Sequence, residues 1–341
     1  MSRKINLNNK LVGSGEQVYI IAEGGVTNFG DLGLAKKQID AAMAAGCDAI
    51  KFQAQTTEEL VSKKVAPDWY ARMKYKELSY HGIRELQRYC SVRNIEFFAT
   101  AHTNVDLDFL DKELNVPFFK VGSGESINYD FLKNVGRRGK PIIISLGLHL
   151  NENEIRKSIG ALEDAGASEI IIMHCNTAYP TPPEINNLRM ITRLKEMFDY
   201  PIGYSDHSVG FHMPLAAVAL GAKIIEKHIS FDLDDLRSLD CSGSCTPETL
   251  KLMVRQIREI EAAMGNPGIL REEKIIQGRQ WAQQSIVAKK DIERGMVIIR
   301  DMLAFKRPGK GLPPYEAEKI IGKTAKRNIE ADELILLDDI I

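Results

Sequence analysis

The sequence has little of what marks a secreted or membrane-bound protein. Its five cysteines are odd in number and scattered, so they do not suggest a disulfide framework. No apolar run is long enough to cross a bilayer, and the polar segment 1–10 lacks the hydrophobic core of a signal peptide. We therefore expect a cytoplasmic protein that has no membrane partner.

The sequence also lacks a charge excess of either sign. Its 45 basic and 46 acidic side chains leave a formal net charge of -1, which gives no reason to expect nucleic acid as a partner. A complete set of zinc ligands is missing as well. Cys241 and Cys245 stand four positions apart, but no second ligand pair accompanies them, so we expect two ordinary thiols.

The chain does contain short apolar runs that alternate with amphipathic stretches. The runs are near-continuous and rich in β-branched residues, which is typical of strands buried on both faces. The clearest helix, Pro247 to Met264, has Thr246 to cap it and Gly265 to end it. Eight strands, each followed by a helix, predict a (β/α)8 TIM barrel over residues 1–268. The eight runs are Val18–Ala22, Ala49–Phe52, Phe97–Thr100, Phe118–Val121, Ile142–Ser145, Ile170–Met173, Ile202–Tyr204 and Ile224–Glu226.

The pattern changes after Gly268. Residues 269–284 are polar and predict a linker, and residues 285–341 contain short β-like pieces punctuated by glycine and proline. A segment of this size is marginal as an independent fold, so we expect it to pack on its own barrel or on a partner's. Within the barrel, the segment 54–79 is longer than an ordinary loop. A lid or specificity loop and an extra surface helix both explain that length.

Polar or ionisable side chains follow nearly every predicted strand. In a parallel barrel these positions converge at the C-terminal mouth. Two lysines, several hydroxyls and the Gly122–Gly124 turn suit a phosphorylated and carboxylated anion. Exposed, snorkelling lysines are a poor alternative, because each lysine follows a buried apolar strand. The residues at the strand ends are Glu23, Lys51 with Gln53, Thr100, Lys120 with Ser123 and Glu125, Ser145, Tyr179, His207 and His228.

Two of these residues, His207 and His228, end the last two predicted strands, so their rings should lie over the same rim. Two imidazoles with carboxylates nearby suit Mn²⁺, Zn²⁺ or a similar ion with open coordination positions. A pair of hydrogen-bonded core histidines explains the same spacing. Asp206 and Glu226 shortly precede the two histidines, and we interpret them as candidate supporting partners of the rings.

Eight stretches of the chain match, in order, those of one known family: Ile21–Glu23, Ile50–Gln53, Phe119–Glu125, Gly139–Ile143, His174-Cys175, Tyr179–Pro182, Gly203–Ser208 and Glu226–His228. The sequence thereby resembles the sialic acid synthases, the phosphoenolpyruvate-dependent nonulosonate synthases, over almost its whole length. The tail, with Lys306–Gly311, resembles the family's antifreeze-like SAF domain, a small and mostly-β domain of the β-clip type.

The resemblance implies a mechanism and an assembly. His207 and His228 would hold a divalent metal ion, Mn²⁺ first and Mg²⁺ or Co²⁺ as alternatives, which polarises an acceptor aldehyde. Carbon 3 of phosphoenolpyruvate would attack that aldehyde, water would add at carbon 2, and phosphate would leave by C–O cleavage. The small domain would reach across a domain-swapped homodimer and deliver Arg307 to the partner's active site.

The resemblance also implies a role for each candidate residue. Glu125 would manage the proton of the water, Glu23 would serve the sugar or the metal-bound water, and Arg307 would contact the sugar acceptor. The residues implied to hold phosphoenolpyruvate are Lys51, Thr100, Lys120, Ser123, Ser145 and one of Asn176 and Thr177. Those implied to face the amino sugar are Gln53, Tyr179, Asp240 and Arg307.

The chain departs from the family pattern where we expect the acceptor. Thr27–Gly30 stands where Asn-His-x-Gly is common, and Leu146 stands where threonine is common. Ser238–Cys241 retains only Asp240 of the usual Gly-Pro-Asp-His. These changes suggest an acceptor other than plain N-acetylmannosamine, such as a 2,4-diacetamido hexose.

Two other functions stay open on the sequence alone. A lysine Schiff-base aldolase with Lys120 as nucleophile would need no metal, which would leave His207 and His228 unexplained. A non-catalytic carbohydrate-binding or ice-binding protein is suggested by the tail. It would give no reason for Glu23 and Glu125 to stand at strand ends.

Overall fold

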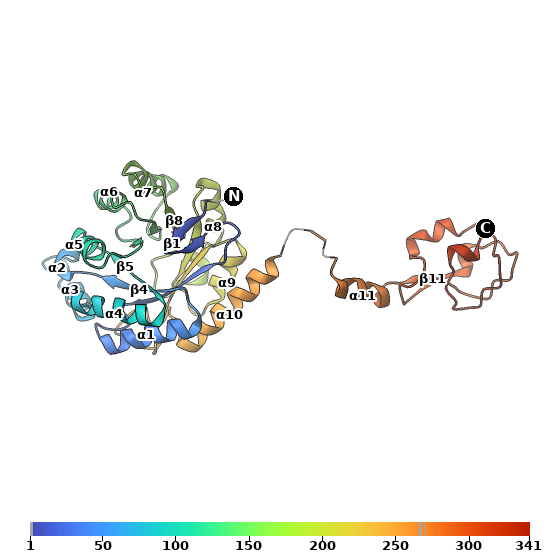
Figure 1. Cartoon of the computed structure of the whole chain (residues 1–341), viewed down its shortest axis with the longest axis horizontal. Coiled ribbons are helices and arrows are strands. Elements are labelled where there is room, and N and C mark those ends of the chain that lie inside the picture. The colour runs from blue at the N-terminus through green and yellow to red at the C-terminus, as the bar shows by residue number, and fades with distance from the viewer. Residues whose placement is uncertain (1–2, 266–267, 270) are drawn as a thin grey trace. The chain divides into compact units, whose positions relative to one another are not determined.

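A computed structural model describes residues 3–265, 268–269 and 271–341, and the chain divides into two compact units, Met1–Gly265 and Asn266–Ile341. The first unit is a closed barrel of eight parallel strands ringed by helices (Figure 1), which confirms the predicted barrel. Around the barrel the order is β10-β3-β4-β5-β6-β7-β8-β9. The strands are β3 (Tyr19–Gly25), β4 (Ala49–Ala54), β5 (Glu96–Ala101), β6 (Phe119–Val121), β7 (Ile142–Ser145), β8 (Ile170–His174), β9 (Ile202–Asp206) and β10 (Ile224–His228).

The helices of this unit begin and end at residues that suit those positions. Helix α10 runs from Pro247 to Met264 as predicted, and the Thr246 side chain accepts a hydrogen bond from the Thr249 backbone N–H. Helix α1 is capped by Asp31 and ends at Gly46, whose φ of 84° favours glycine. The helices are α1 (Leu32–Ala45), α2 (Thr57–Leu60), α3 (Pro67–Lys76), α4 (Tyr80–Arg93), α5 (Asn104–Asp108) with a π-helical turn (Phe109–Glu113), α6 (Tyr129–Gly136), α7 (Glu152–Asp164), α8 (Arg189–Met197), α9 (His212–Ala219) and α10, with a 3₁₀ turn at Pro183–Ile185.

Alternate residues of each strand face the inside of the barrel. Toward the N-terminal ends these positions are apolar and form one interior cluster, which includes Ile21, Phe98, Ile143 and Ile224. Two residues further along each strand the inward position is polar. The barrel therefore has a dry lower half and a polar upper half, and the polar half carries the candidate residues.

A short antiparallel hairpin, β1 (Ile5–Leu7) and β2 (Lys10–Val12), packs against the N-terminal ends of the barrel strands. Ile5, Leu7 and Val12 belong to the same interior cluster as the lower barrel residues, and each is at most 2 % exposed. This hairpin was not predicted from the sequence, because its strands are only three residues long. Its apolar side chains close the lower half of the barrel.

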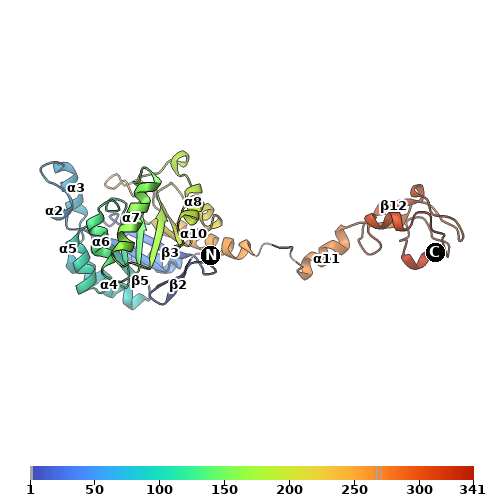
Figure 2. The same ribbon diagram turned by 90° about the horizontal axis from the view of Figure 1, so that it is seen from above.

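The long segment 54–79 contains two helices, α2 and α3, so it is not an irregular loop. Helix α3 projects at the rim of the barrel in the second view (Figure 2). Its Trp69 is 56 % exposed. The segment forms helices, as the extra-helix interpretation predicted, but its side chains also reach the site described below, so a lid or specificity role stays a prediction.

The second unit has a small apolar core of its own, formed by residues such as Ile286, Ile298, Ile320 and Ile335. The stretch predicted as a polar linker includes helix α11 (Glu273–Ala282), none of whose residues is buried. The rest consists of β11 (Ser285–Ala288) paired with β12 (Leu303–Lys306), isolated bridges, and 3₁₀ turns at Arg300–Met302, Pro314–Lys319 and Leu337–Asp339. Across the described part of the chain, no helix is both long and apolar enough to span a membrane.

Candidate active site

A cavity of about 370 Å³ opens at the C-terminal ends of the barrel strands. Polar side chains from all eight strands or from the loops that follow them line it, as expected for the mouth of a parallel barrel. The residues singled out from the sequence that line this cavity are Glu23, Lys51, Gln53, Thr100, Lys120, Ser123, Glu125, Ser145, Thr177, Tyr179, His207 and His228.

Lys51 lies between two buried carboxylates. Its Nζ is 3.0 Å from Glu23, 3.3 Å from Glu226 and 3.0 Å from the Thr100 hydroxyl. Burial raises the pKa of Glu23 to about 7, Lys51 opposes that rise, and the charge of Glu226 adds to it. For Lys51, burial alone would lower the pKa, but the two carboxylates outweigh burial and raise it. Lys51 therefore stays charged at neutral pH.

Lys120 has a different environment, because its hydrogen bonds go to neutral oxygens. Its Nζ donates to the Ser145 hydroxyl at 2.6 Å and to the Val121 carbonyl at 3.1 Å. Burial lowers its pKa, although Glu226 partly offsets that effect. A buried ammonium with neutral partners gains more from an incoming anion than an ammonium already held by carboxylates.

Hydroxyl groups converge at the turn after β7. The Ser123 hydroxyl accepts a hydrogen bond from the Gly147 backbone N–H at 3.0 Å. A Cβ at position 147 would lie only 2.8 Å from the Thr177 hydroxyl and 3.0 Å from that of Ser123, so this close approach requires glycine. Asn176 is turned away, because its amide donates to the Asn186 carbonyl at 3.1 Å. Of the two adjacent candidates, Thr177 is the one that reaches the cavity.

The rings of His207 and His228 lie side by side, with 5.3 Å between their centroids. Burial lowers the pKa of His207 to about 4 and, with neighbouring basic groups, holds that of His228 well below its usual range. Both rings are therefore neutral at pH 7, the form in which imidazole binds metals. The Nδ1 of His228 is buried without a hydrogen-bond partner among the described residues. Two neutral rings, one with a free nitrogen, fit a divalent ion.

The protein donor set for such an ion is small. Within residues 3–265, 268–269 and 271–341, no group of three His, Cys, Asp or Glu side chains could hold a metal. Asp240 lies close to the pair, with its carboxylate 3.7 Å from His228 Nδ1. Tyr179 lies 3.2 Å from His207 Nε2 through its hydroxyl.

The interpretation of Asp206 and Glu226 as partners of the two rings is wrong. Glu226 faces the cavity, where it accepts a hydrogen bond from Ser205 at 3.2 Å and pairs with Lys51. Asp206 lies on the opposite face of β9, where it forms a fully buried ion pair with Lys227. Strand alternation explains the error, because Asp206 and Lys227 occupy outward positions next to the inward-facing histidines.

Glu125 folds back over the turn between β6 and α6. A Cβ at Gly122 would lie 2.6 Å from its carboxylate, so a side chain at that position would displace Glu125. One carboxylate oxygen, Oε1, is 3.0 Å from Nδ1 of His102. Although burial alone would raise the pKa of Glu125, His102, a backbone hydrogen bond and the charge of Lys120 together outweigh burial and lower it. The Glu125 carboxylate is therefore ionised at neutral pH.

Several lining residues were missed or lie elsewhere. His102, Ser205, Cys175, Leu60, Trp69, Met73 and Leu148 also line the cavity. His102 could have been found by continuing the inward alternation of Phe98 and Thr100 by one more step. Arg307 belongs to the second unit, which is compact by itself.

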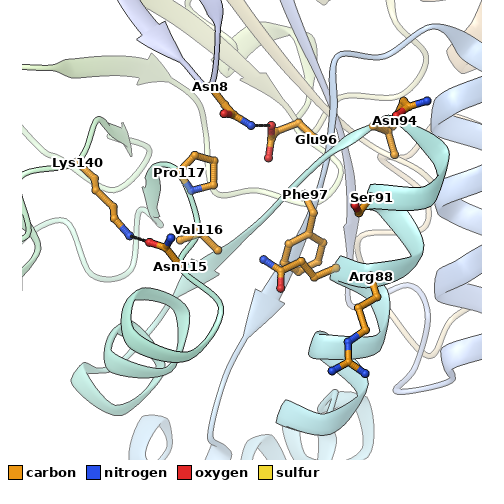
Figure 3. Close-up of a pocket in the computed structure, with 12 residues that line it drawn as sticks. Asn8, Arg88, Ser91, Asn94, Glu96, Phe97, Asn115, Val116, Pro117 and Lys140 are labelled. Atoms are coloured by element: carbon orange, nitrogen blue, oxygen red, sulfur yellow. Dashed lines mark hydrogen bonds between the residues drawn. The ribbon is translucent and has the colours of Figure 1, made fainter.

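A wider hollow of about 800 Å³ lies at the other ends of the strands (Figure 3). It is lined by residues at or before the starts of β5, β6 and β7, including Glu96, Pro117 and Lys140. Lys140 donates to Asn115 at 3.0 Å, and Asn8 donates to Glu96. These ordinary surface interactions, at the wrong end of a parallel barrel for catalysis, leave the upper cavity as the candidate active site.

Comparison with known proteins identifies a family for the barrel and another for the C-terminal unit. The NeuB family model matches residues 38–268, and the SAF domain model matches residues 283–341. The chain is 38 % identical to the N,N'-diacetyllegionaminic acid synthase of Campylobacter jejuni, over 94 % of this chain and 99 % of that one. It is 35 % identical to the human N-acetylneuraminate-9-phosphate synthase, over 95 % and 93 % of the two chains.

A solved structure resembles the chain in three dimensions. The N-acetylneuraminic acid (sialic acid) synthetase of Leptospira borgpetersenii, in complex with citrate, has a TM-score of 0.76 and 33 % sequence identity. The match covers 82 % of this chain and 95 % of that one.

Proposed function

Since the chain belongs to the NeuB family of sialic acid synthases, we propose that it condenses phosphoenolpyruvate with the aldehyde of an N-acetylated amino hexose. The product would be a nine-carbon 2-keto-3-deoxy sugar acid. The observation that carries the proposal is the upper barrel cavity, where two buried lysines, three carboxylates and two neutral histidines meet.

The lysine side of the cavity suits phosphoenolpyruvate. Lys51 and Lys120 are each at most 3 % exposed, so an anion there would interact with two cations that water screens poorly. Hydroxyl groups next to the lysines supply neutral donors for the remaining phosphate and carboxylate oxygens. We assign this role to Thr100, Ser123, Ser145 and Thr177, and we leave Asn176 out because its side chain points elsewhere.

The histidine side of the cavity suits the acceptor. His207 and His228 would hold a divalent metal ion, Mn²⁺ first and Mg²⁺ or Co²⁺ as alternatives, which supplies Lewis-acid polarisation of the aldehyde oxygen when it is bound. Gln53 and Tyr179 line the same side, and Asp240 lies next to His228. These three side chains would position the sugar hydroxyls and amide.

The carboxylates would move protons during the reaction. Carbon 3 of phosphoenolpyruvate forms a bond to the aldehyde carbon, and water then adds at carbon 2. Glu125, ionised at neutral pH, takes the proton of that water. Phosphate leaves with the oxygen that joined it to carbon 2, and the proton passes to it. Glu23, whose pKa is raised to about 7, would give its proton to the aldehyde oxygen as carbon 3 bonds, and would regain a proton from the C2 hydroxyl as the ketone forms.

The acceptor and the assembly are the finer parts of the proposal. A 38 % identity to an enzyme named for N,N'-diacetyllegionaminic acid favours a 2,4-diacetamido hexose over N-acetylmannosamine. Arg307 would reach the cavity of a partner subunit in a domain-swapped homodimer and bind the sugar there. A Schiff-base aldolase is the weaker alternative, because Lys120 would have to work beside two histidines and a carboxylate that such chemistry leaves idle.

Phosphate release from phosphoenolpyruvate, measured across a panel of acetamido hexoses with Mn²⁺ present, tests the function. We expect release with a mono- or diacetamido hexose and a sugar acid as co-product. Borohydride trapping of a pyruvate adduct on Lys120 would instead support the aldolase. Absence of phosphate release with every sugar in the panel, from folded and metal-loaded protein, would contradict the proposed reaction.

A further inference from the structure

We propose that His102 is a positioning residue for this reaction and forms one acid–base unit with Glu125. The inference rests on the proposed function for its chemistry and on the geometry of the cavity for the pairing. His102 Nδ1 lies 3.0 Å from Glu125 Oε1, and both side chains line the cavity. The two residues follow different strands, His102 after β5 and Glu125 after β6.

The pair is built into the barrel. His102 follows β5 on the same inward face as Thr100, and Glu125 reaches it by folding back over Gly122. The side chains are only 15 % and 12 % exposed, respectively. A buried contact between an imidazole and a carboxylate is stronger than the same contact in water, because little solvent competes for either group.

Each partner also has one polar atom left over. Glu125 Oε2 and His102 Nε2 are both buried, and among the described residues neither has a hydrogen-bond partner. A buried polar atom without a partner is costly unless a ligand or water completes it. The two free atoms belong to side chains at the cavity wall, so we assign Oε2 of Glu125 to the reacting water. His102 holds the other carboxylate oxygen and fixes the orientation of the group.

The charges around the pair make the proton balance clear. The groups that act on Glu125 are His102 after β5 and Lys120 from β6, while Glu23, Lys51 and Glu226 stand across the cavity. When water adds to carbon 2, its O–H bond breaks and the proton goes to Glu125. The C2–O bond of the phosphate ester then breaks as the C2 hydroxyl becomes the ketone: phosphate takes the electron pair and the proton held by Glu125, and the second proton of the added water balances the one gained by the former aldehyde oxygen. His102 is unchanged over the cycle.

The test compares His102→Phe, which removes the hydrogen bond, with His102→Asn, whose amide N–H can replace Nδ1 as a donor. His81→Phe is the matched control, because His81 is exposed on α4. With the acceptor that supports phosphate release, kcat of His102→Phe should fall about 10- to 100-fold, with KM for phosphoenolpyruvate little changed. His102→Asn should recover part of kcat, and the control should match the unaltered protein.

The pH profile separates positioning from a general structural defect. Without His102, only the backbone hydrogen bond to Glu125 and the charge of Lys120 oppose its burial, so the carboxylate takes up a proton more readily. The acid limb of kcat/KM should therefore move to higher pH, by about one unit in His102→Phe and by less in His102→Asn. An acid limb that stays in place in His102→Phe would overturn the inference.

An infrared pH titration gives a readout that does not need turnover. In His102→Phe, the band of a protonated carboxylic acid should appear at higher pH than in the unaltered protein. That difference should vanish in His102→Phe/Glu125→Gln, which lacks the carboxyl group. If no sugar supports phosphate release but the band shifts, the pairing stands and the proposed reaction fails. If the band does not shift while the unaltered enzyme turns over, the reaction stands and the role of His102 is refuted.

Discussion

Replacing Lys227 by methionine is expected to destabilise the barrel by about 3 kcal/mol, because it leaves the Asp206 carboxylate buried without its cation. The two side chains are directly opposite each other on β9 and β10, and both are 0 % exposed. Their strands continue into His207 and on to His228. The pair therefore connects the two strand ends that carry the candidate metal ligands.

The magnitude follows from the partners that remain. Removing one member of a buried pair typically costs about 3–5 kcal/mol. After Lys227→Met, Asp206 keeps hydrogen bonds from the Tyr204 hydroxyl at 2.8 Å, the Ser208 backbone N–H at 3.0 Å and the Ser208 hydroxyl at 2.7 Å. These three donors put the cost at the low end of that range. After Asp206→Asn, Lys227 would keep only the Ser208 carbonyl at 2.7 Å as a full acceptor, so the cost should be about 4 kcal/mol.

The double variant distinguishes a coupled pair from two independent residues. With both charges removed, neither partner is left uncompensated, so the loss should not exceed that of the worse single variant. The coupling energy would then be about 3 kcal/mol. Lys112→Met is a suitable control, because Lys112 pairs with Asp108 on the surface and should cost less than about 1 kcal/mol.

Urea unfolding of the full chain, followed by circular dichroism, measures these differences as shifts of the midpoint at constant slope. A second expected effect is weaker metal binding, because loss of the ion pair should displace the strand ends that carry His207 and His228. Calorimetric titration with Mn²⁺ measures this effect. Single-variant losses that simply add in the double variant would refute the reasoning. So would a Lys227→Met protein as stable as the Lys112→Met control.

Four further outcomes are expected. Exhaustive chelation should abolish activity and Mn²⁺ should restore it, whereas His228→Ala should stay inactive after metal is added back; full activity of the chelated protein would exclude the metal role. With ¹⁸O at the bridging position of phosphoenolpyruvate, mass spectrometry should find the label in released phosphate, and label kept in the sugar acid would indicate P–O cleavage. Mixing Arg307→Ala with Glu125→Ala chains should partly restore activity if the dimer is swapped, and no recovery in proven heterodimers would mean that each tail serves its own barrel. Burial raises the pKa of Glu23 to about 7, so the folded protein keeps a proton there that the unfolded chain releases above about pH 4.5, and stability is lost as the pH rises from about 4.5 to about 7. Relative to the unaltered protein, Glu23→Gln should therefore gain stability across that pH window. A difference in urea midpoint that stays constant with pH would contradict the raised pKa.

The barrel could be predicted from the sequence because its signal is repeated eight times. Each strand contains a short, mostly apolar run, and each is followed by a polar residue that parallel geometry brings to one mouth. The helix at Pro247–Met264 was predictable to the residue, because its cap, first residue and stop are all local signals. The hairpin at Ile5–Val12 was not, because its stability comes from packing against strands far away in the chain.

The site was predictable only as far as chain order allows. Glu23, Lys51, Lys120 and His228 could be placed at the mouth by counting strand ends. The partner of each residue depends on strand register and direction, which the sequence does not state. Asp206 is next to His207 in the chain and yet faces the other way, toward Lys227. His102 escaped notice because it lies just past the end of β5, where the apolar run has already stopped.

The β1–β2 hairpin fills the lower end of the barrel, and the candidate active site opens at the other end, where the strands end. Lys51 and Lys120 line this cavity together with Tyr179 and Trp69. On the proposed function, phosphoenolpyruvate, which would bind the two buried lysines, should therefore enter before the sugar. The sugar acid should likewise leave before the phosphate. The β1–β2 hairpin, at the end of the barrel away from the candidate active site, would thereby set the order of binding and release.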